Sequence, residues 1–228
     1  MVGQNSLRGG NIALNLPFYS SPDDTHCFQA VLKMILAYFL PGRSYTWADL
    51  ETISAKKERL WTWPTAAVIA LREMGFDVVL IEDFDYERFA ERGEDYVLEH
   101  YGGEVGRVQI DHSDVAQEMR LARELIGIIM PKVAVPSFGD IKRLMSLGYV
   151  LACNLNSRIL NNKDGYAGHF VVITGIDDDH ITLHDPGIPP HPNRKVSKEL
   201  FEKSWGYPLR NSRNVIAFRL PASHKPGK

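Results

Sequence analysis

The chain has 228 residues, of which 44% are hydrophobic, and it carries a formal net charge of −2. That length accommodates one sizeable domain with a buried core, and the small net charge provides no basic surface for binding a nucleic acid. The sequence contains neither a run of about 18 apolar residues nor a signal peptide, so we expect no membrane partner and a cytoplasmic location. We therefore expect a single domain over residues 1–228.

Residues 1–16 are expected to form a flexible N-terminal segment. This segment contains the tetrapeptide LRGG at residues 7–10, which suggests a self-cleavable double-glycine leader as an alternative. A flexible terminus is the simpler interpretation of the same residues.

The stretch DDTHCFQAVLKMILAYF, residues 23–39, predicts a helix enclosed by other elements, because residues 28–40 are apolar on nearly every side. Asp24 and Thr25 are plausible N-cap residues, which would place Cys27 in the first helical turn. Unpaired N–H groups and the positive end of the helix dipole favour a thiolate there. Cys27 is therefore a candidate nucleophile, although a packing role is equally open at this point.

Further helices are predicted over Trp47 to Leu60 and from about Pro64 to Gly75, and the segment FDVVLI that follows has the composition of a strand. Residues 85–127 are charged and helical, and we interpret them as a solvated helical hairpin inserted into the domain. Ser137 and Asp140 have the spacing of a capping box, which predicts that another helix begins there.

The second half of the chain is rich in β-branched and aromatic residues, which are typical of strands. The predicted strands are YVLACNL, HFVVITGI, HITLHD and NVIAFRL, and they are expected to form one largely antiparallel sheet. Helices followed by strands indicate an α+β architecture. Cys153 lies within the first of these strands, where packing in the core is the expected role, and no disulfide with Cys27 is expected in a reducing compartment.

The segment GHFVVITGIDDDHITLHDPG predicts a β-hairpin with Asp177 to Asp179 at its tip. A three-residue loop would pair Ile176 with His180 and place His169 on the same face as Asp185, one diagonal step away and within side-chain reach. A two-residue loop would turn Asp185 to the other face, so the contact requires an odd loop or a bulge. In the predicted register the imidazole and the carboxylate lie at one edge of the sheet, where Cys27 could meet them.

Two blocks of the sequence, PFYSSPDDTHCFQAVLKMIL and GYVLACNL with AGHFVVITGIDDDHITLHDPG, resemble the papain-like cysteine peptidases of the bacteriocin-processing, double-glycine-leader type and their stand-alone relatives. The resemblance implies a papain-like fold in which the Cys-bearing helix packs on a mainly antiparallel sheet. It also implies that Cys27 is the nucleophile, His169 the general base and Asp185 the residue that orients the base.

The chain departs from that family at two positions. A glutamine that completes the oxyanion hole usually precedes the nucleophile by six residues, and this chain has Ser21 there. A serine side chain is shorter, so Ser21 is a doubtful oxyanion donor, and loss of one such donor lowers turnover on the order of 100- to 1,000-fold. The glycine that usually follows the nucleophile is replaced by Phe28, and Gln29 is expected to be an ordinary polar helix residue.

Three functions remain open from the sequence. The first is a cysteine peptidase or amidase that acts on a peptide or protein substrate. The second is a catalytically weak, peptide-binding relative with an impaired oxyanion hole, and the third is an acyl or peptidyl transferase. The sequence does not predict an oligomeric state.

No cofactor and no metal site are expected. A zinc site made of His26, Cys27, His169 and Asp185 is disfavoured, because adjacent His and Cys residues suit a tetrahedral ion poorly. Three further histidines, His180, His184 and His191, are expected to have surface or packing roles. Trp205 is expected either to shelter the pair formed by His169 and Asp185, as similar peptidases suggest, or simply to pack.

Overall fold

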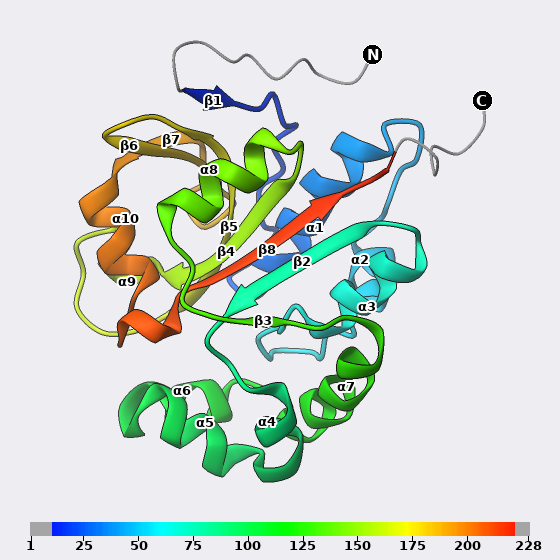
Figure 1. Ribbon diagram of the computed structural model, residues 1–228, viewed down its shortest axis with the longest axis vertical. Helices are drawn as coiled ribbons and strands as arrows, with labels where there is room; N and C mark the ends of the chain where they lie inside the picture. The colour runs from blue at the N-terminus through cyan, green and yellow to red at the C-terminus, as the bar shows by residue number, and fades with distance from the viewer. Residues whose placement is uncertain (1–10, 222–228) are drawn as a thin grey trace.

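The computed structural model describes residues 11–221, so the LRGG tetrapeptide lies outside the described residues. The strands of this part of the chain form one sheet in the order β3-β2-β8-β4-β5-β6-β7, and β1 pairs with β5 (Figure 1). The strands are β1 (Ile12–Ala13), β2 (Asp77–Glu82), β3 (Lys132–Val133), β4 (Val150–Asn156), β5 (Gly168–Ile176), β6 (His180–Asp185), β7 (His191–Ser197) and β8 (Asn214–Arg219).

The sheet is mainly antiparallel, as the sequence predicts, and among the described strands the pair β2 and β3 is parallel. The four strands predicted in the second half correspond to β4, β5, β6 and β8, and FDVVLI corresponds to β2. The predicted α+β class is confirmed. Strand β7 was not predicted, because HPNRKVS is mostly exposed and polar and lacks an apolar alternation.

The helices of the described residues are α1 (Cys27–Phe39), α2 (Trp47–Ile53), α3 (Thr65–Glu73), α4 (Tyr86–Arg92), α5 (Glu94–Tyr101), α6 (Gly103–Asp111), α7 (Val115–Ile128), α8 (Phe138–Ser146), α9 (Ser157–Leu160) and α10 (Lys198–Trp205), with a short 3-10 helix at Arg210–Ser212. Helix α1 lies behind the sheet in the view of Figure 1, α8 lies in front of it, and α4 to α7 gather below it.

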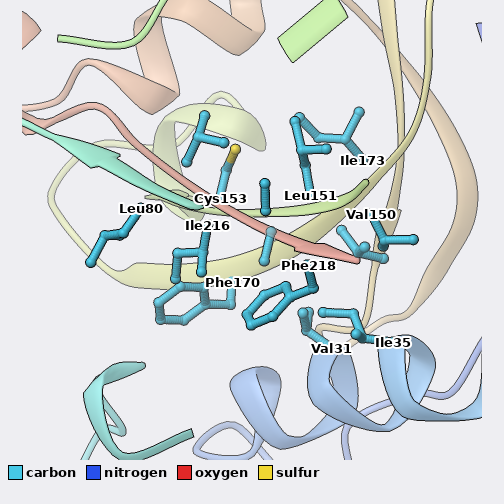
Figure 2. Packing of buried hydrophobic residues seen from close by; sticks show 14 of the residues in the cluster. Val31, Ile35, Leu80, Val150, Leu151, Cys153, Phe170, Ile173, Ile216 and Phe218 are labelled. Atoms are coloured by element: carbon cyan, nitrogen blue, oxygen red, sulfur yellow. The ribbon is translucent and has the colours of Figure 1, made fainter. Parts of the chain in front are cut away.

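Helix α1 is buried along most of its length and packs on the sheet, as predicted. Figure 2 shows Val31 and Ile35 of α1 pointing towards Phe218, which lies on the face of the sheet that α1 covers. Cys153 and Ile173 lie on the opposite face of the sheet. Both faces of the central strands are therefore covered by apolar side chains. This packing fixes the position of the first turn of α1 relative to β5.

One predicted helix is shorter in the structure, and one predicted helix start is confirmed. The helix predicted to reach Leu60 ends at Ile53, because Ala55 has a φ of 48°, which is incompatible with a right-handed helix. The predicted capping box of Ser137 and Asp140 is confirmed at the start of α8: the Ser137 hydroxyl accepts a bond from the N–H of Asp140, and the carboxylate of Asp140 accepts one from the N–H of Ser137.

Residues 85–127 form four helices rather than the expected hairpin. Gly93 and Gly102 separate α4, α5 and α6, and their φ values of 53° and 79° end each helix. These helices are also less solvated than expected, since Phe89 and Val97 are fully buried. The charged residues of this segment therefore surround an apolar face that the sequence analysis did not identify.

The described part of the expected flexible N-terminal segment is ordered against the sheet. Ile12 pairs with Ile176 of β5, and the N–H of Leu14 donates a hydrogen bond to the carbonyl of Thr174 over 2.7 Å. Leu14 and Leu16 are both buried. The expectation of flexibility was therefore wrong for residues 11–16, because their alternating apolar side chains have a place in the core.

Candidate active site

Cys27 is the first residue of α1, within the helical turn that the sequence predicts. The N-cap is His26, which makes no side-chain capping bond, so the predicted N-caps Asp24 and Thr25 were wrong. The first turn of α1 contains no acidic residue. The helix dipole therefore acts on the half-buried Cys27 side chain without an opposing negative charge from the same turn.

The segment before Cys27 is organised around Asp23. Its Oδ1 atom accepts hydrogen bonds from the N–H and the hydroxyl of Thr25 over 2.8 and 2.9 Å, and it lies 2.8 Å from Nδ1 of His26. The Nε2 atom of His26 lies 2.8 Å from Oε1 of Glu51. Both ring nitrogens of His26 are thus engaged, which removes His26 from the zinc site considered above.

His169 and Asp185 are in contact, with 2.7 Å between Nε2 of the imidazole and Oδ1 of the carboxylate. His169 lies near the start of β5, and Asp185 is the last residue of β6. The pair is nearly excluded from solvent, since both side chains are buried. The predicted contact between the two side chains is therefore present.

The hairpin reaches this contact through a bulge rather than through a three-residue loop. The sequence predicts that Ile176 pairs with His180. In the structure Ile176 pairs with Ile181 instead. The register shifts between Ile173 and Gly175, and Val172 then pairs with His184. One extra residue in β5 therefore restores the predicted register, and without it Asp185 would face the other side of the sheet.

Two groups that the sequence analysis missed hold the Asp185 carboxylate. Nη1 of Arg194 donates a hydrogen bond to Oδ2 over 2.9 Å, and the N–H of Gly187 donates one to Oδ1 over 3.0 Å. Nη2 of Arg194 donates to the carbonyl of Leu160 over 2.8 Å, which fixes the guanidinium. No sequence signal identified Arg194, because the strand that carries it lacks an apolar alternation.

The electrostatics of these groups favour charge separation. Burial raises the pKa of Asp185, but its hydrogen bonds with His169, Gly187 and Arg194 outweigh burial and hold that pKa at about 2. Burial lowers the pKa of the His169 imidazole, but contacts with Asp185 and Cys27 raise it above its ordinary value. Because Asp185 is an acceptor only, Nε2 of His169 carries a proton and Nδ1 is left to exchange one.

The two cysteines have opposite electrostatic environments. Burial raises the pKa of the Cys27 thiol, but interaction with His169 and with the N–H groups of Phe170 and Phe28 lowers it below its ordinary value. Burial alone raises the pKa of Cys153, which is fully buried in β4 as expected. Both cysteines are free. Of the two thiols, Cys27 is therefore the one whose surroundings favour the thiolate.

The structure places the Ser21 hydroxyl in a local turn. It donates a hydrogen bond to the carbonyl of Asp23 over 2.5 Å, and the N–H of Ser21 donates to the carbonyl of Pro186 over 2.8 Å. The single hydroxyl proton is thus already used. Gln29 is fully buried rather than an ordinary polar helix residue, and its Nε2 atom donates to the hydroxyls of Ser54 and Thr62 over 2.8 and 2.9 Å.

The remaining candidates have structural contacts. The His184 ring is buried between the carbonyl of Leu16 and the N–H of Asn193, a packing role, whereas His191 is exposed and His180 partly so. Trp205 is buried and lines the same cavity as Cys27, and its Nε1 donates to the carbonyl of Asn214 over 2.8 Å. Residues 11–221 contain no cluster of His, Cys, Asp and Glu suited to a metal ion, and none of their helices is long and apolar enough to cross a membrane.

Comparison with known proteins finds a match to a family model over about a third of this chain. Residues 140–214 match the model of the Peptidase C39 family. The match includes His169, Asp185 and Arg194 but not Cys27. It confirms the resemblance noted in the sequence for this part of the chain and supports a relationship with cysteine peptidases.

Three solved structures are similar to the chain at low identity. The peptidase domain of Streptococcus ComA, a bi-functional ABC transporter of a quorum-sensing pathway, is 15% identical with a TM-score of 0.49, over 90% of this chain and 98% of that one. A double-glycine-motif protease from an AMS/PCAT transporter is 13% identical with a TM-score of 0.48, over 92% and 94%. A C39-like peptidase from Bacillus anthracis is 17% identical with a TM-score of 0.48, over 96% and 99%. No curated protein matches the chain.

Proposed function

We propose that the protein is a cysteine peptidase or amidase in which Cys27 is the nucleophile, His169 the general base and Asp185 the residue that orients the base. The observation that carries this proposal is the buried contact between His169 and Asp185 beside a thiol whose pKa is lowered by the same imidazole. A thiol, an imidazole and a carboxylate in that order can perform acyl transfer. The free thiols suit a reducing compartment, so the proposal includes a cytoplasmic location.

In the proposed mechanism, Nδ1 of His169 accepts the thiol proton of Cys27, and the sulfur attacks the carbonyl carbon of a peptide or amide. The carbonyl oxygen becomes an oxyanion, which N–H groups of the first turn of α1 can stabilise because they have no carbonyl partner within the helix. The imidazolium then donates its proton to the leaving amine as the C–N bond breaks. Water, deprotonated by His169, hydrolyses the thioester and regenerates the thiol.

One observation favours a second candidate, a catalytically weak relative that binds peptides. The hydroxyl of Ser21 donates to Asp23 and is not free for an oxyanion. A site that lacks one side-chain donor would turn over slowly while its cleft retained affinity for peptides.

The experiment that separates the two candidates is a screen of a peptide library with the wild type, Cys27→Ala and Cys153→Ala. The peptidase proposal predicts cleavage by the wild type and by Cys153→Ala, and none by Cys27→Ala. Binding of the same peptides by all three proteins without cleavage would instead support the binding relative. Neither cleavage nor binding would overturn both candidates.

A further inference from the structure

A cavity is lined by Cys27 at one position and by residues of the helices of residues 85–127 at others. It encloses about 970 Å³, including space open to solvent. Cys27 and Asp24 line it near the start of α1, Glu82 at the end of β2, and Tyr101 and Gln109 from α5 and α6. Its lining therefore joins the thiol of Cys27 to the helices of residues 85–127.

The walls of the cavity are largely aromatic and are fixed by their neighbours. Trp61 stacks on His112 with ring centroids 4.8 Å apart, and Tyr166 stacks on Tyr207 at 5.9 Å. Trp63, whose Nε1 donates to the Ser113 hydroxyl over 2.9 Å, forms another wall. Aromatic faces attract cations as well as apolar groups, so these walls suit a long aliphatic chain that ends in a positive charge.

The charge of the cavity lining is one-sided. The lining contains the carboxyl groups of Asp24 and Glu82 and no lysine, arginine or histidine among the described residues. Glu82 is half-buried, and its Oε1 atom accepts a hydrogen bond from the Tyr86 hydroxyl over 2.6 Å. Tyr101 also interacts with Glu82, and it supplies no positive charge.

The lack of a cation among the described lining residues affects the protonation of Glu82. Burial raises the pKa of Glu82 to about 7 and outweighs the hydrogen bond from the Tyr86 hydroxyl, which lowers it. A buried carboxylate is stable when it is paired with a cation. A purely apolar occupant would remove the remaining water from Glu82 without supplying a partner, and an acidic occupant would be repelled.

We propose that this cavity is a specificity pocket that receives a lysine- or arginine-type side chain of the substrate, whose cation pairs with Glu82 between the aromatic walls. The inference rests on the proposed function, since it assigns the substrate class of the Cys27 site. Glu82 acts here as a residue that determines specificity. Because Cys27 lines the same cavity, the basic residue is expected near the bond that is cleaved.

The test uses the full chain and pairs of peptides that differ at one position by arginine or its uncharged isostere citrulline. In successive pairs the variable residue occupies each position that flanks the cleaved bond. The value of kcat/KM for each peptide is measured with the wild type, Glu82→Gln and Glu91→Gln. Glu91 is exposed on α4, so its variant makes the same chemical change outside the cavity. A second variant, Glu82→Asp, retains the carboxylate and controls for a loss of folding.

At one position the wild type is expected to prefer arginine on the order of 10- to 100-fold in kcat/KM, the range for a hydrogen-bonded charge. Glu82→Gln should lose this preference but still cleave the citrulline peptide, Glu82→Asp should keep part of it, and Glu91→Gln should match the wild type. Cleavage without an arginine preference, or a preference that survives in Glu82→Gln, overturns the inference and leaves the proposed function standing.

Binding of N-acetyl-arginine amide, followed by tryptophan fluorescence in Cys27→Ala, provides a readout that needs no catalysis. Binding that Glu82→Gln abolishes supports the pocket even if no peptide is cleaved, in which case only the proposed function fails. Absence of both cleavage and binding overturns the inference as well.

Discussion

Arg194 and Asp185 form a largely buried ion pair on the side of the carboxylate that faces away from His169, with 2.9 Å between Nη1 and Oδ2. The carboxylate is thereby held between a guanidinium and an imidazole. This relationship makes Arg194 a positioning residue, because it acts on Cys27 only through Asp185 and His169.

Replacement of Arg194 by methionine is expected to lower kcat/KM on the order of 10- to 100-fold, because removal of one partner leaves a buried charge unpaired and lets the imidazole move. Arg194 contributes to the lowered pKa of Asp185, so that pKa should rise and the acidic limb of the pH–rate profile should move to higher pH. Arg194→Lys should recover part of the activity. The control is Lys195→Met, which removes an exposed ion pair with Asp177. An unchanged pH profile in Arg194→Met would contradict the positioning role.

Replacement of Ser21 by alanine is expected to change kcat/KM by less than about threefold, because the hydroxyl donates to the carbonyl of Asp23 rather than to a substrate. A side-chain donor to the oxyanion would cost on the order of 100- to 1,000-fold when removed. Steady-state kinetics on a peptide from the library screen distinguish the two outcomes. A loss in the larger range would show that Ser21 turns towards the oxyanion when substrate binds.

Replacement of Gly187 by alanine is expected to lower kcat clearly while it changes the free energy of unfolding little. A Cβ atom at this position would lie 3.0 Å from Oδ1 of Asp185 and 3.2 Å from Cε1 of His169, which is closer than ordinary van der Waals contact. The added methyl group should push the two side chains apart. Kinetics and urea denaturation of the same variant test this, and wild-type kcat would show that the turn gives way instead.

Glu82 and Glu118 make the folded state sensitive to pH, since burial raises the pKa of each from 4.5 to about 7. The folded state therefore binds more protons than the unfolded state between these values, and stability is lost as pH rises from about 4.5 to 7. We expect Glu82→Gln and Glu118→Gln to raise the free energy of unfolding at pH 8 by about 1–3 kcal/mol, with no gain at pH 4. Urea denaturation at the two pH values checks this, with Glu91→Gln as the control. Equal effects at both pH values would contradict it.

The sequence predicted the central part of the fold because its signals are local. The apolar run of α1, the capping box of Ser137 and the β-branched strands each depend on neighbouring residues, and each is present in the structure. The contact between His169 and Asp185 was predicted from strand alternation together with the resemblance. The bulge at Thr174 that produces this register left no recognisable pattern in the sequence.

The remaining features depend on contacts between distant segments. Arg194 and Glu82 gain their significance from the side chains that surround them in space, which periodicity does not reveal. The tryptophans of the segment LWTWP were a usable signal, since tryptophan is enriched at interfaces. The four helices of residues 85–127 were mistaken for a solvated hairpin because their charged residues mask a narrow apolar face.

The activation of Cys27 by His169 is tested most directly by the rate of iodoacetamide alkylation as a function of pH, with the modified residue identified by peptide mapping. The wild type should react rapidly at pH 6, at Cys27 alone, because His169 lowers the pKa of that thiol while Cys153 is buried. His169→Gln should react on the order of 10-fold more slowly at pH 6, and its rate should rise near the ordinary thiol pKa of about 8.5. Equal rates for the wild type and His169→Gln at pH 6 would show that His169 does not activate Cys27.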